Sequence, residues 1–308
     1  MFKSKDASPP LVVIGTVALD TIETPFGKKE HLFGGSASYF SYAASFFTRV
    51  GLVAVVGKDF PEEYRKVLLE RPIDLSHLEV AEGETFAWSG KYEFDMNTAQ
   101  TLDTRLNVLL KFNPRLIFNE PPEYLFLANI DPDLQEKVLH QVDKPKLKFV
   151  ACDTMNFWIQ NKKSQLIKIL SRVDCLVLND AEARQLTGVA NLVRAAQLIK
   201  EFGPDYVVIK KGEHGILAYY QDQFFTLPAF PLENVVDPTG AGDSFAGGMI
   251  GYLVSQANHK IDTFKNAIAC GIVMASFTVE DFGLDALRKL KIEDFWQRLE
   301  IFRKVSTF

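Results

Sequence analysis

Residues 236–245 combine two glycines, a carboxylate and the start of an apolar run, and they are the part of the chain best suited to chemistry. Pro238 has no N–H group and disfavours helix at the residue before it, so regular structure must end there. Gly240 and Gly242 allow a tight turn that leaves backbone N–H groups close to a ligand. The apolar run after Asp243 predicts a helix whose positive end faces this turn, which is an anion site.

Asp243 is unexpected in such a turn, because its carboxylate would repel a bound phosphate. A role that explains it is that of a general base, which takes the proton from a hydroxyl group as that group attacks the phosphate. The alternative is structural, since Asp is a good N-cap and glycine-rich turns before helices are common. The first interpretation predicts a kinase, and the second predicts only a capped turn.

The whole string Asp237-Pro-Thr-Gly-Ala-Gly-Asp243 resembles the C-terminal signature of the ribokinase-like (PfkB) family of carbohydrate and nucleoside kinases. The resemblance extends from about residue 11 to about residue 282, with the motifs in the family's order. It implies transfer of the ATP γ-phosphoryl group to a hydroxyl of a sugar or sugar-like polyol, with ATP and Mg²⁺ required. Asp243 would be the base, and the backbone of Gly240, Ala241 and Gly242 would stabilise charge on the moving phosphoryl group.

The same resemblance implies a ribokinase-like three-layer α/β/α fold with a mostly parallel central sheet and a small antiparallel β lid. Residues 1–308 would form a single kinase domain, into which lid segments at about 20–33 and 84–105 are inserted.

Gly34 and Gly35 precede small residues and an apolar helix, and they resemble the family's N-terminal signature, which holds substrate hydroxyls. Tyr39 stands where many members carry Asn, and Ser36 stands where ribokinases carry Lys. These departures argue against ribose itself as the acceptor. Asp20 matches the family's substrate-hydroxyl acid, and its alternative is a solvated loop acid.

Asn129 and Asp153 each end a predicted strand, and both are further candidates for substrate contact. Asp153 and Asn156 lie in a segment that resembles the Asp-x-Asn segment near the phosphate or sugar in related sugar kinases. The aromatic residues that follow, Phe157 and Trp158, are expected to pack in the core or the lid.

Asn179 and Glu182 match the family's N-x-x-E motif at a predicted strand-to-helix junction. The resemblance places both near hydrated Mg²⁺, acting largely through water, because Mg²⁺ keeps several waters and bridges nucleotide phosphates. The structural alternative is a capping box, in which Asn179 caps the helix and Glu182 closes the box three residues later.

The segment 209–215 resembles the strand and turn that line the nucleotide in relatives. Gly212 and Gly215 suit a close approach of the backbone to the nucleotide. Lys210 is a candidate phosphate contact, with a solvated surface lysine as its alternative. Asp237 matches a family position that supports a monovalent-cation loop, so K⁺ is a further candidate cofactor.

The elements that position these residues alternate along the chain. Short apolar runs predict buried parallel strands at 11–15, 53–57, 125–129, 149–153, 175–179 and 206–210. Helical patterns lie between several of them, at 132–141, 163–171, 181–187 and 192–202. Polar residues at the strand ends would then gather at the carboxyl edge of an open α/β sheet, where ligands bind.

Two regions interrupt this alternation. Residues 20–33 suit a hairpin, and residues 85–94 alternate strictly, with Phe86, Trp88, Tyr92 and Phe94 on one face. Such an aromatic face requires a cover. The resemblance implies a lid that often joins two chains, so a homodimer through the lid is one expectation, and packing on the same chain is the other.

Composition restricts the function classes. The chain has 308 residues and a net charge of −5, which argues against a nucleic-acid surface. No apolar run approaches the length of a membrane span, and residues 11–14 are too short for the core of a signal peptide. Three widely spaced cysteines without a CxxC pair support neither a disulfide framework nor a zinc site, and they favour a reducing cytoplasm.

Three alternatives to a sugar kinase follow from the same residues. A nucleoside such as adenosine is the second choice of acceptor, and a non-catalytic sugar- or nucleotide-binding regulator on the same fold is the third function. A dinucleotide-binding oxidoreductase is disfavoured because no GxGxxG follows the first strand, and the Walker pattern of P-loop enzymes is also absent.

Overall fold

The computed structural model describes residues 8–142 and 146–307. Within them, nine strands form one sheet in the order β13-β12-β11-β10-β9-β8-β1-β4-β5. The strands are β1 (Leu11–Ile14), β4 (Val50–Gly57), β5 (Ile73–Ala81), β8 (Tyr124–Leu127), β9 (Phe149–Asp153), β10 (Cys175–Asn179), β11 (Tyr206–Lys210), β12 (Ile216–Tyr220) and β13 (Gln223–Leu227).

The predicted central sheet is confirmed. All neighbouring pairs from β5 to β11 are parallel, and only β12 and β13 pair antiparallel at one edge. The predicted strands are found at their positions, because each is a short apolar run buried on both faces. Their carboxyl ends therefore point the same way and form one edge.

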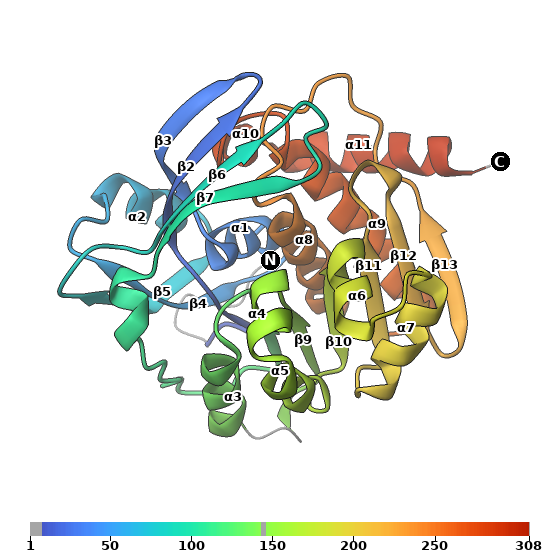
Figure 1. Ribbon diagram of the computed structural model, residues 1–308, viewed down its shortest axis with the longest axis horizontal. Coiled ribbons are helices and arrows are strands. Elements are labelled where there is room, and N and C mark those ends of the chain that lie inside the picture. The colour runs from blue at the N-terminus through green and yellow to red at the C-terminus, as the bar shows by residue number, and fades with distance from the viewer. Residues whose placement is uncertain (1–7, 143–145, 308) are drawn as a thin grey trace.

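Two helical layers enclose this sheet. One core cluster packs α1 (Ser36–Ala44), α2 (Glu62–Leu69), α8 (Ala241–Gln256), α9 (Ile261–Thr278), α10 (Asp285–Lys289) and α11 (Ile292–Ser306) on one face. The other cluster packs α3 (Pro132–Gln141), α4 (Asn156–Asn161), α5 (Lys163–Leu170), α6 (Asp180–Thr187) and α7 (Leu192–Glu201) on the opposite face. This is the predicted three-layer α/β/α arrangement (Figure 1).

A small sheet rises above the main body (Figure 1). Its four strands, in the order β3-β2-β6-β7 within the described residues, are β2 (Ala18–Thr24), β3 (Gly27–Gly34), β6 (Ala87–Tyr92) and β7 (Ala99–Arg105). The predicted hairpin is β2–β3, and both outer pairs are antiparallel. The middle pair β2–β6 is parallel, because both strands run outward from the main body. The chain then returns to the main body along β3 and along β7.

The aromatic face of the lid is covered by this chain itself. Tyr92 is buried against Ile22 and Phe282, and Trp88 packs on the same cluster. β6 ends at Tyr92, so the predicted alternation stops there and Phe94 is 95% exposed. The cover that the aromatic face requires is therefore supplied by the same chain. A homodimer through the lid stays a prediction.

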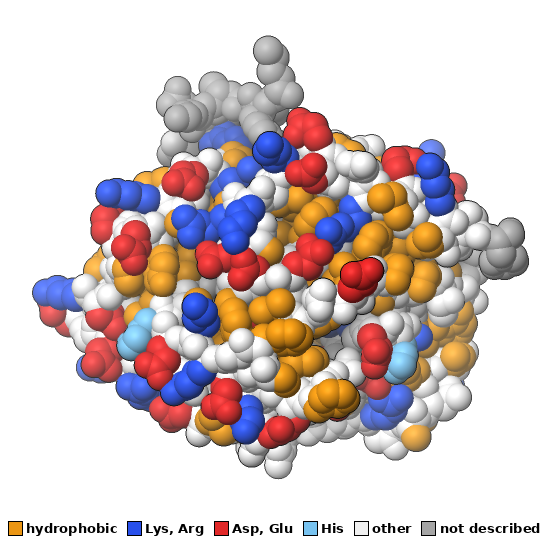
Figure 2. Space-filling model, turned by 90° about the horizontal axis from the view of Figure 1, so that it is seen from above, with side chains coloured by type: hydrophobic (Ala, Val, Ile, Leu, Met, Phe, Trp, Pro, Cys, Tyr) orange, Lys and Arg blue, Asp and Glu red, His pale blue; other side chains and the backbone are white. Residues whose placement is uncertain are grey.

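The molecular surface agrees with the sequence composition. On the face seen in Figure 2, Lys and Arg side chains are interspersed with Asp and Glu and form no continuous basic band. Among the described residues, no helix combines the length and the hydrophobicity that crossing a membrane requires.

Candidate active site

The N-termini of α1 and α8 meet where the lid joins the main sheet. Gly35 is the N-cap of α1 and Gly240 is the N-cap of α8, and the two helices pack against each other. Gly240 has a φ of 75°, a conformation that favours glycine, and a Cβ there would overlap the Tyr39 ring. The glycine turn is therefore supported from below by an aromatic ring.

The turn presents free amide donors. The amide of Thr239 donates to Asp237 Oδ1 at 2.9 Å, and that of Ala241 donates to the Pro238 carbonyl at 3.2 Å. No hydrogen bond among the described residues occupies the amides of Gly242 and Asp243. These two amides are therefore available to an anion, and the predicted anion site at Gly240, Ala241 and Gly242 stays a prediction.

Asp243 is not the N-cap of α8, so the structural alternative for this residue is wrong. Gly240 is the cap, Asp243 is the third helical residue, and no side-chain capping bond is made. Burial and then the charge of Asp153 raise the pKa of Asp243 to about 7, against the opposing effect of Lys210. A carboxyl group that titrates near neutral pH can accept a proton and release it.

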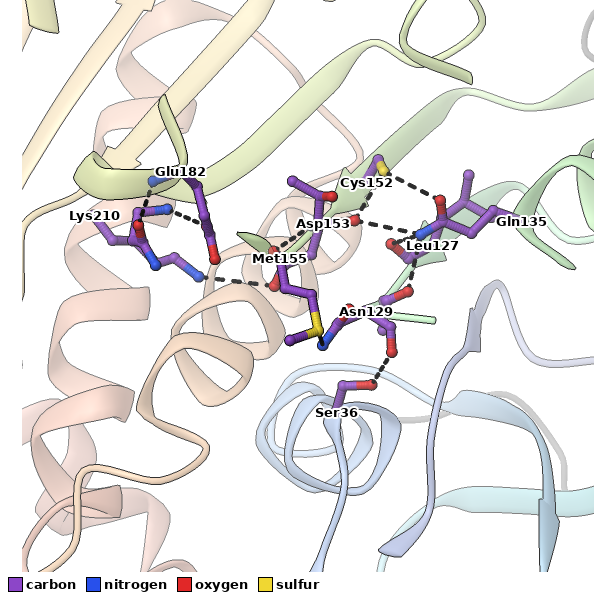
Figure 3. Close-up of polar contacts among 12 residues, drawn as sticks. Ser36, Leu127, Asn129, Gln135, Cys152, Asp153, Met155, Glu182 and Lys210 are labelled. Atoms are coloured by element: carbon purple, nitrogen blue, oxygen red, sulfur yellow. Dashed lines mark hydrogen bonds and ion pairs between the residues drawn. The ribbon is translucent and has the colours of Figure 1, made fainter. Parts of the chain in front are cut away.

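Asp153 and Lys210 end β9 and β11, and Glu182 lies in the first turn of α6 between them (Figure 3). The charges of all three interact with that of Asp243. Lys210 Nζ is 3.7 Å from Asp153 Oδ2, and a Cβ added to Gly242 would lie 2.7 Å from the same nitrogen. Only 18% of the Lys210 side chain is exposed, so it is not the solvated lysine of the alternative interpretation. Its ammonium lies at the anion turn.

The Asp153 carboxyl group forms an ion pair with Lys210. Its side chain is 6% exposed, and Oδ1 accepts from the Thr154 amide at 2.6 Å while Oδ2 faces Lys210. Burial raises its pKa, and Lys210 is the main opposing influence. Asp153 thus forms an ion pair with Lys210, and its predicted contact with the substrate stays a prediction.

Asn179 and Glu182 form the capping box that was the structural alternative. Asn179 Oδ1 accepts from the Glu182 amide at 2.8 Å, and Glu182 Oε2 accepts from the Asn179 amide at 2.7 Å. Glu182 Oε1 makes no such bond, and burial raises the Glu182 pKa to about 7 against the opposing effect of Lys210. Glu182 can therefore close the capping box through Oε2 and still contact hydrated Mg²⁺ through Oε1.

The donor set fits Mg²⁺ held through water and phosphate. Among the described residues, no three His, Cys, Asp or Glu side chains are grouped closely enough to hold a metal ion by themselves. Separate carboxylates beside an anion turn suit an ion that keeps most of its water and bridges phosphate oxygens.

The turn after β11 is the segment predicted to line the nucleotide, and that role stays a prediction. Gly212 and Gly215 have φ values of 56° and 80°, which explains both glycines. Gly212 is exposed, whereas a Cβ on the buried Gly215 would overlap the Leu227 carbonyl oxygen, so Gly215 serves packing against β13. Asn97, at the tip of the lid, reaches this turn and donates to Glu213 at 3.1 Å.

Asp20, the predicted acceptor-binding acid, lies in lid strand β2. Its carboxyl group lies against Gly34, where a Cβ would overlap Oδ2, and the amides of Gly35 and Trp88 stabilise its charged form. Burial, followed by the charge of Asp237, raises the Asp20 pKa to about 8. Asp20 is 4% exposed and its Oδ1 has no hydrogen-bond partner among the described residues, so the solvated-loop alternative is wrong.

The side chain of Asn129 is held by two residues whose part in the site the sequence did not predict. Its Oδ1 accepts from Trp158 Nε1 at 3.0 Å, and its Nδ2 donates to Met155 Sδ at 3.2 Å (Figure 3). Ser36 Oγ donates to the Asn129 carbonyl at 3.0 Å and is buried. Ser36 therefore joins α1 to the end of β8.

Gln135 is a second residue that the sequence did not identify. From α3 its Nε2 donates to the carbonyls of Ala128 and Asp153, at 3.0 and 3.3 Å (Figure 3). Gln135 is buried and thereby fixes the spacing of the two strand ends. No local motif marks it, because its partners are brought together only by the sheet.

Tyr39 and Asp237 support the turn. Tyr39 is 1% exposed and its ring packs on Gly240, so its packing is structural and an acceptor contact stays a prediction. Asp237 is fully buried, and its oxygens accept from the amides of Thr239 and Gly283, the latter at 3.1 Å. It therefore clamps the turn to the segment after α9, and a cation role also stays a prediction.

Comparison with known proteins identifies the family. A family model described as pfkB family carbohydrate kinase matches residues 12–289. The chain is 33% identical to a cytidine kinase of Thermococcus kodakarensis over an alignment of 248 residues. This alignment covers 78% of this chain and 87% of that protein.

Two solved structures share the fold. The nucleoside kinase of Methanocaldococcus jannaschii has a TM-score of 0.75 at 22% identity, covering 96% of this chain and 99% of its own. A putative ribokinase II from E. coli, in complex with ATP and Mg²⁺, has a TM-score of 0.79 at 16% identity, covering 96% and 100%. With the family model matched over nearly its whole length, the chain belongs to the pfkB family of carbohydrate kinases.

Proposed function

We propose that this protein transfers the γ-phosphoryl group of ATP to a hydroxyl group of a nucleoside. One observation supports the reaction above the others: Asp243 lies at the first turn of α8, next to two unoccupied amides. The sequence favoured a sugar or polyol with a nucleoside second. We reverse that order because the cytidine kinase that aligns over most of this chain acts, by its name, on a nucleoside.

Asp243 would take the proton from the acceptor hydroxyl as that oxygen attacks the phosphoryl group. The amides of Gly242 and Asp243 and the Lys210 ammonium would stabilise the charge on the moving phosphoryl oxygens. Asp20 would orient the acceptor by accepting from, or donating to, a second hydroxyl. Mg²⁺, near Glu182 through water, would neutralise phosphate charge.

A bare sugar or polyol is the second candidate acceptor. Asp20, Gly34 and Gly35 form a compact group that would hold hydroxyls without reference to a base. A panel of nucleosides, ribose and inositol, assayed with Mg²⁺ and ATP, separates the two candidates. Ligand binding without any phosphorylation would instead favour a non-catalytic regulator.

The general base is tested with Asp243→Asn and a matched control. Asp262→Asn removes an exposed aspartate from the first turn of α9, outside the site. Asp243→Asn is expected to lower kcat by about 100-fold or more, while Asp262→Asn leaves it unchanged. Near-normal turnover of the Asp243 variant would overturn the assignment.

Three further proposals accompany this function. K⁺ would support the turn at Asp237, which predicts higher activity in KCl than in tetramethylammonium chloride at equal ionic strength. A homodimer through the lid would appear as a doubled mass in sedimentation. A cytoplasmic location fits the three buried free cysteines. Residues 1–308 would form one kinase domain.

A further inference from the structure

The inner face of the lid strand β6 lies over the anion turn. In the parallel β2–β6 pair, Asp20 is registered with Trp88 and Ile22 with Gly90, so their side chains share one face. Tyr92 lies on that face, and its hydroxyl accepts from Thr239 Oγ1 at 3.3 Å, just before Gly240. The face that carries Trp88 is thus the roof of the acceptor site.

Gly90 makes room for an indole. A Cβ built on Gly90 would overlap atoms Cη2 and Cζ2 of Trp88, so the six-membered ring lies on the Gly90 backbone. Gly90 is not among the glycines with positive φ, and its backbone would accept any residue. The absence of a side chain at Gly90 is therefore explained by the position of the Trp88 ring.

The ring is also fixed along its edge. Trp88 Nε1 donates to Thr101 Oγ1 at 3.3 Å, and Thr101 is the β7 residue registered with Gly90. With one face on Gly90 and the nitrogen held by Thr101, the indole cannot turn freely. Trp88 is only partly buried, which leaves part of its ring surface exposed, and its own backbone amide stabilises the charged form of Asp20.

We infer that the Trp88 indole, seated on Gly90, stacks on the base of a nucleoside acceptor and so selects a nucleoside over a bare sugar. This inference rests on the proposed function and names the residue that sets its acceptor class. Asp20, which is registered with Trp88 on the neighbouring strand β2, would hold a ribose hydroxyl while the base extends under β6 and β7. A fixed aromatic plane matches a flat base better than a puckered ring.

The test compares binding of cytidine and D-ribose to the full-length enzyme, by calorimetry with Mg²⁺ and an unhydrolysable ATP analogue. Stacking of about 1–3 kcal/mol corresponds to a change of about 5- to 150-fold. Trp88→Leu is expected to raise the Kd for cytidine by that factor and to change the Kd for ribose less than about twofold. Gly90→Ala is expected to act in the same direction, because its methyl group displaces the ring.

Two variants serve as controls. Ser89→Ala changes the opposite face of the same strand and is expected to leave both affinities unchanged. Trp88→Phe keeps an aromatic ring and is expected to retain most of the cytidine affinity, which separates stacking from a general loss of lid packing. Thermal melts confirm that each variant is folded.

The outcomes distinguish the two proposals. If Trp88→Leu binds cytidine as the wild type does, or loses affinity for cytidine and ribose equally, the stacking role is wrong while nucleoside phosphorylation by the wild type stands. If the wild type phosphorylates ribose or inositol but none of cytidine, uridine and adenosine, the proposed acceptor is wrong and the stacking role with it.

Discussion

The activity of this enzyme should fall on acidification near neutral pH, because Asp243, the proposed general base, has a raised pKa. Burial is the largest cause, Asp153 adds to it, and together they bring the Asp243 pKa to about 7 against the effect of Lys210. The base acts only as a carboxylate, so log kcat/KM for the acceptor should decrease with unit slope below that pKa. At pH 6 about a tenth of the enzyme remains active, whereas an ordinary aspartate would show no loss.

Two variants should move this acidic limb in opposite directions. Asp153→Asn removes a like charge, so the Asp243 pKa falls and the limb moves to lower pH. Lys210→Met removes the cation that favours the carboxylate, so the limb moves to higher pH. The plateau of the Lys210 variant should also drop, by about 100-fold if the ammonium contributes as one donor of an anion hole does.

Glu182 also titrates at about 7, so the assignment needs one more variant. Glu182→Gln keeps the helix cap, since glutamine also closes a capping box, and removes the second titrating carboxyl. The limb should persist in it, and Asp262→Asn should leave the limb in place. A wild-type limb below pH 5, or a shift of both charge variants in the same direction, would refute this account of the site.

Two remaining predictions concern the glycine turn and the buried acid. Gly240→Ala combines a strained φ with overlap on the Tyr39 ring and should lower kcat by at least about 100-fold. The control is Gly188→Ala, where φ is 74° and the space around the glycine is open. This control should cost about 1–2 kcal/mol of stability without changing kcat. Asp20 has a raised folded-state pKa, so its contribution to folding is present below its unfolded pKa and is lost as the pH rises from about 4 to about 8. Asp20→Asn should therefore raise the melting temperature at pH 8 more than at pH 5 while weakening acceptor binding, and equal shifts at both pH values would contradict the ionisation argument.

The fold was largely predictable because its parallel strands are buried on both faces. A strand such as Val50–Gly57 is apolar throughout and is recognised without knowledge of its neighbours. β5 and β13 were not predicted, because exposed polar residues interrupt their patterns at the two edges of the sheet. The parallel β2–β6 pair was also unexpected, since register between distant segments depends on where both strands leave the main body.

The candidate site was predictable to the extent that its residues belong to local motifs. Turn glycines and the N-x-x-E box carry their spacing in the sequence, so Gly240 and Glu182 were found from it. Trp158 and Gln135 have no motif, because the partner of each lies on another strand or helix. The sequence also left open whether Asp243 caps α8, and the backbone decides this by placing the cap at Gly240.

The charge state of the site depends on contacts between residues that are far apart in the sequence. Asp153, Glu182 and Asp243 gather around one ammonium because β9 and β11 end, and α6 and α8 begin, at the same edge. Burial makes full ionisation of all three carboxyl groups unfavourable. Lys210 alone cannot balance them, so protons are retained near neutral pH. The arrangement lowers stability as the pH rises, and it also leaves a carboxyl group at Asp243 whose pKa suits the proposed role of general base. Stability lost to buried like charges and reactivity gained at the base thus have one physical cause.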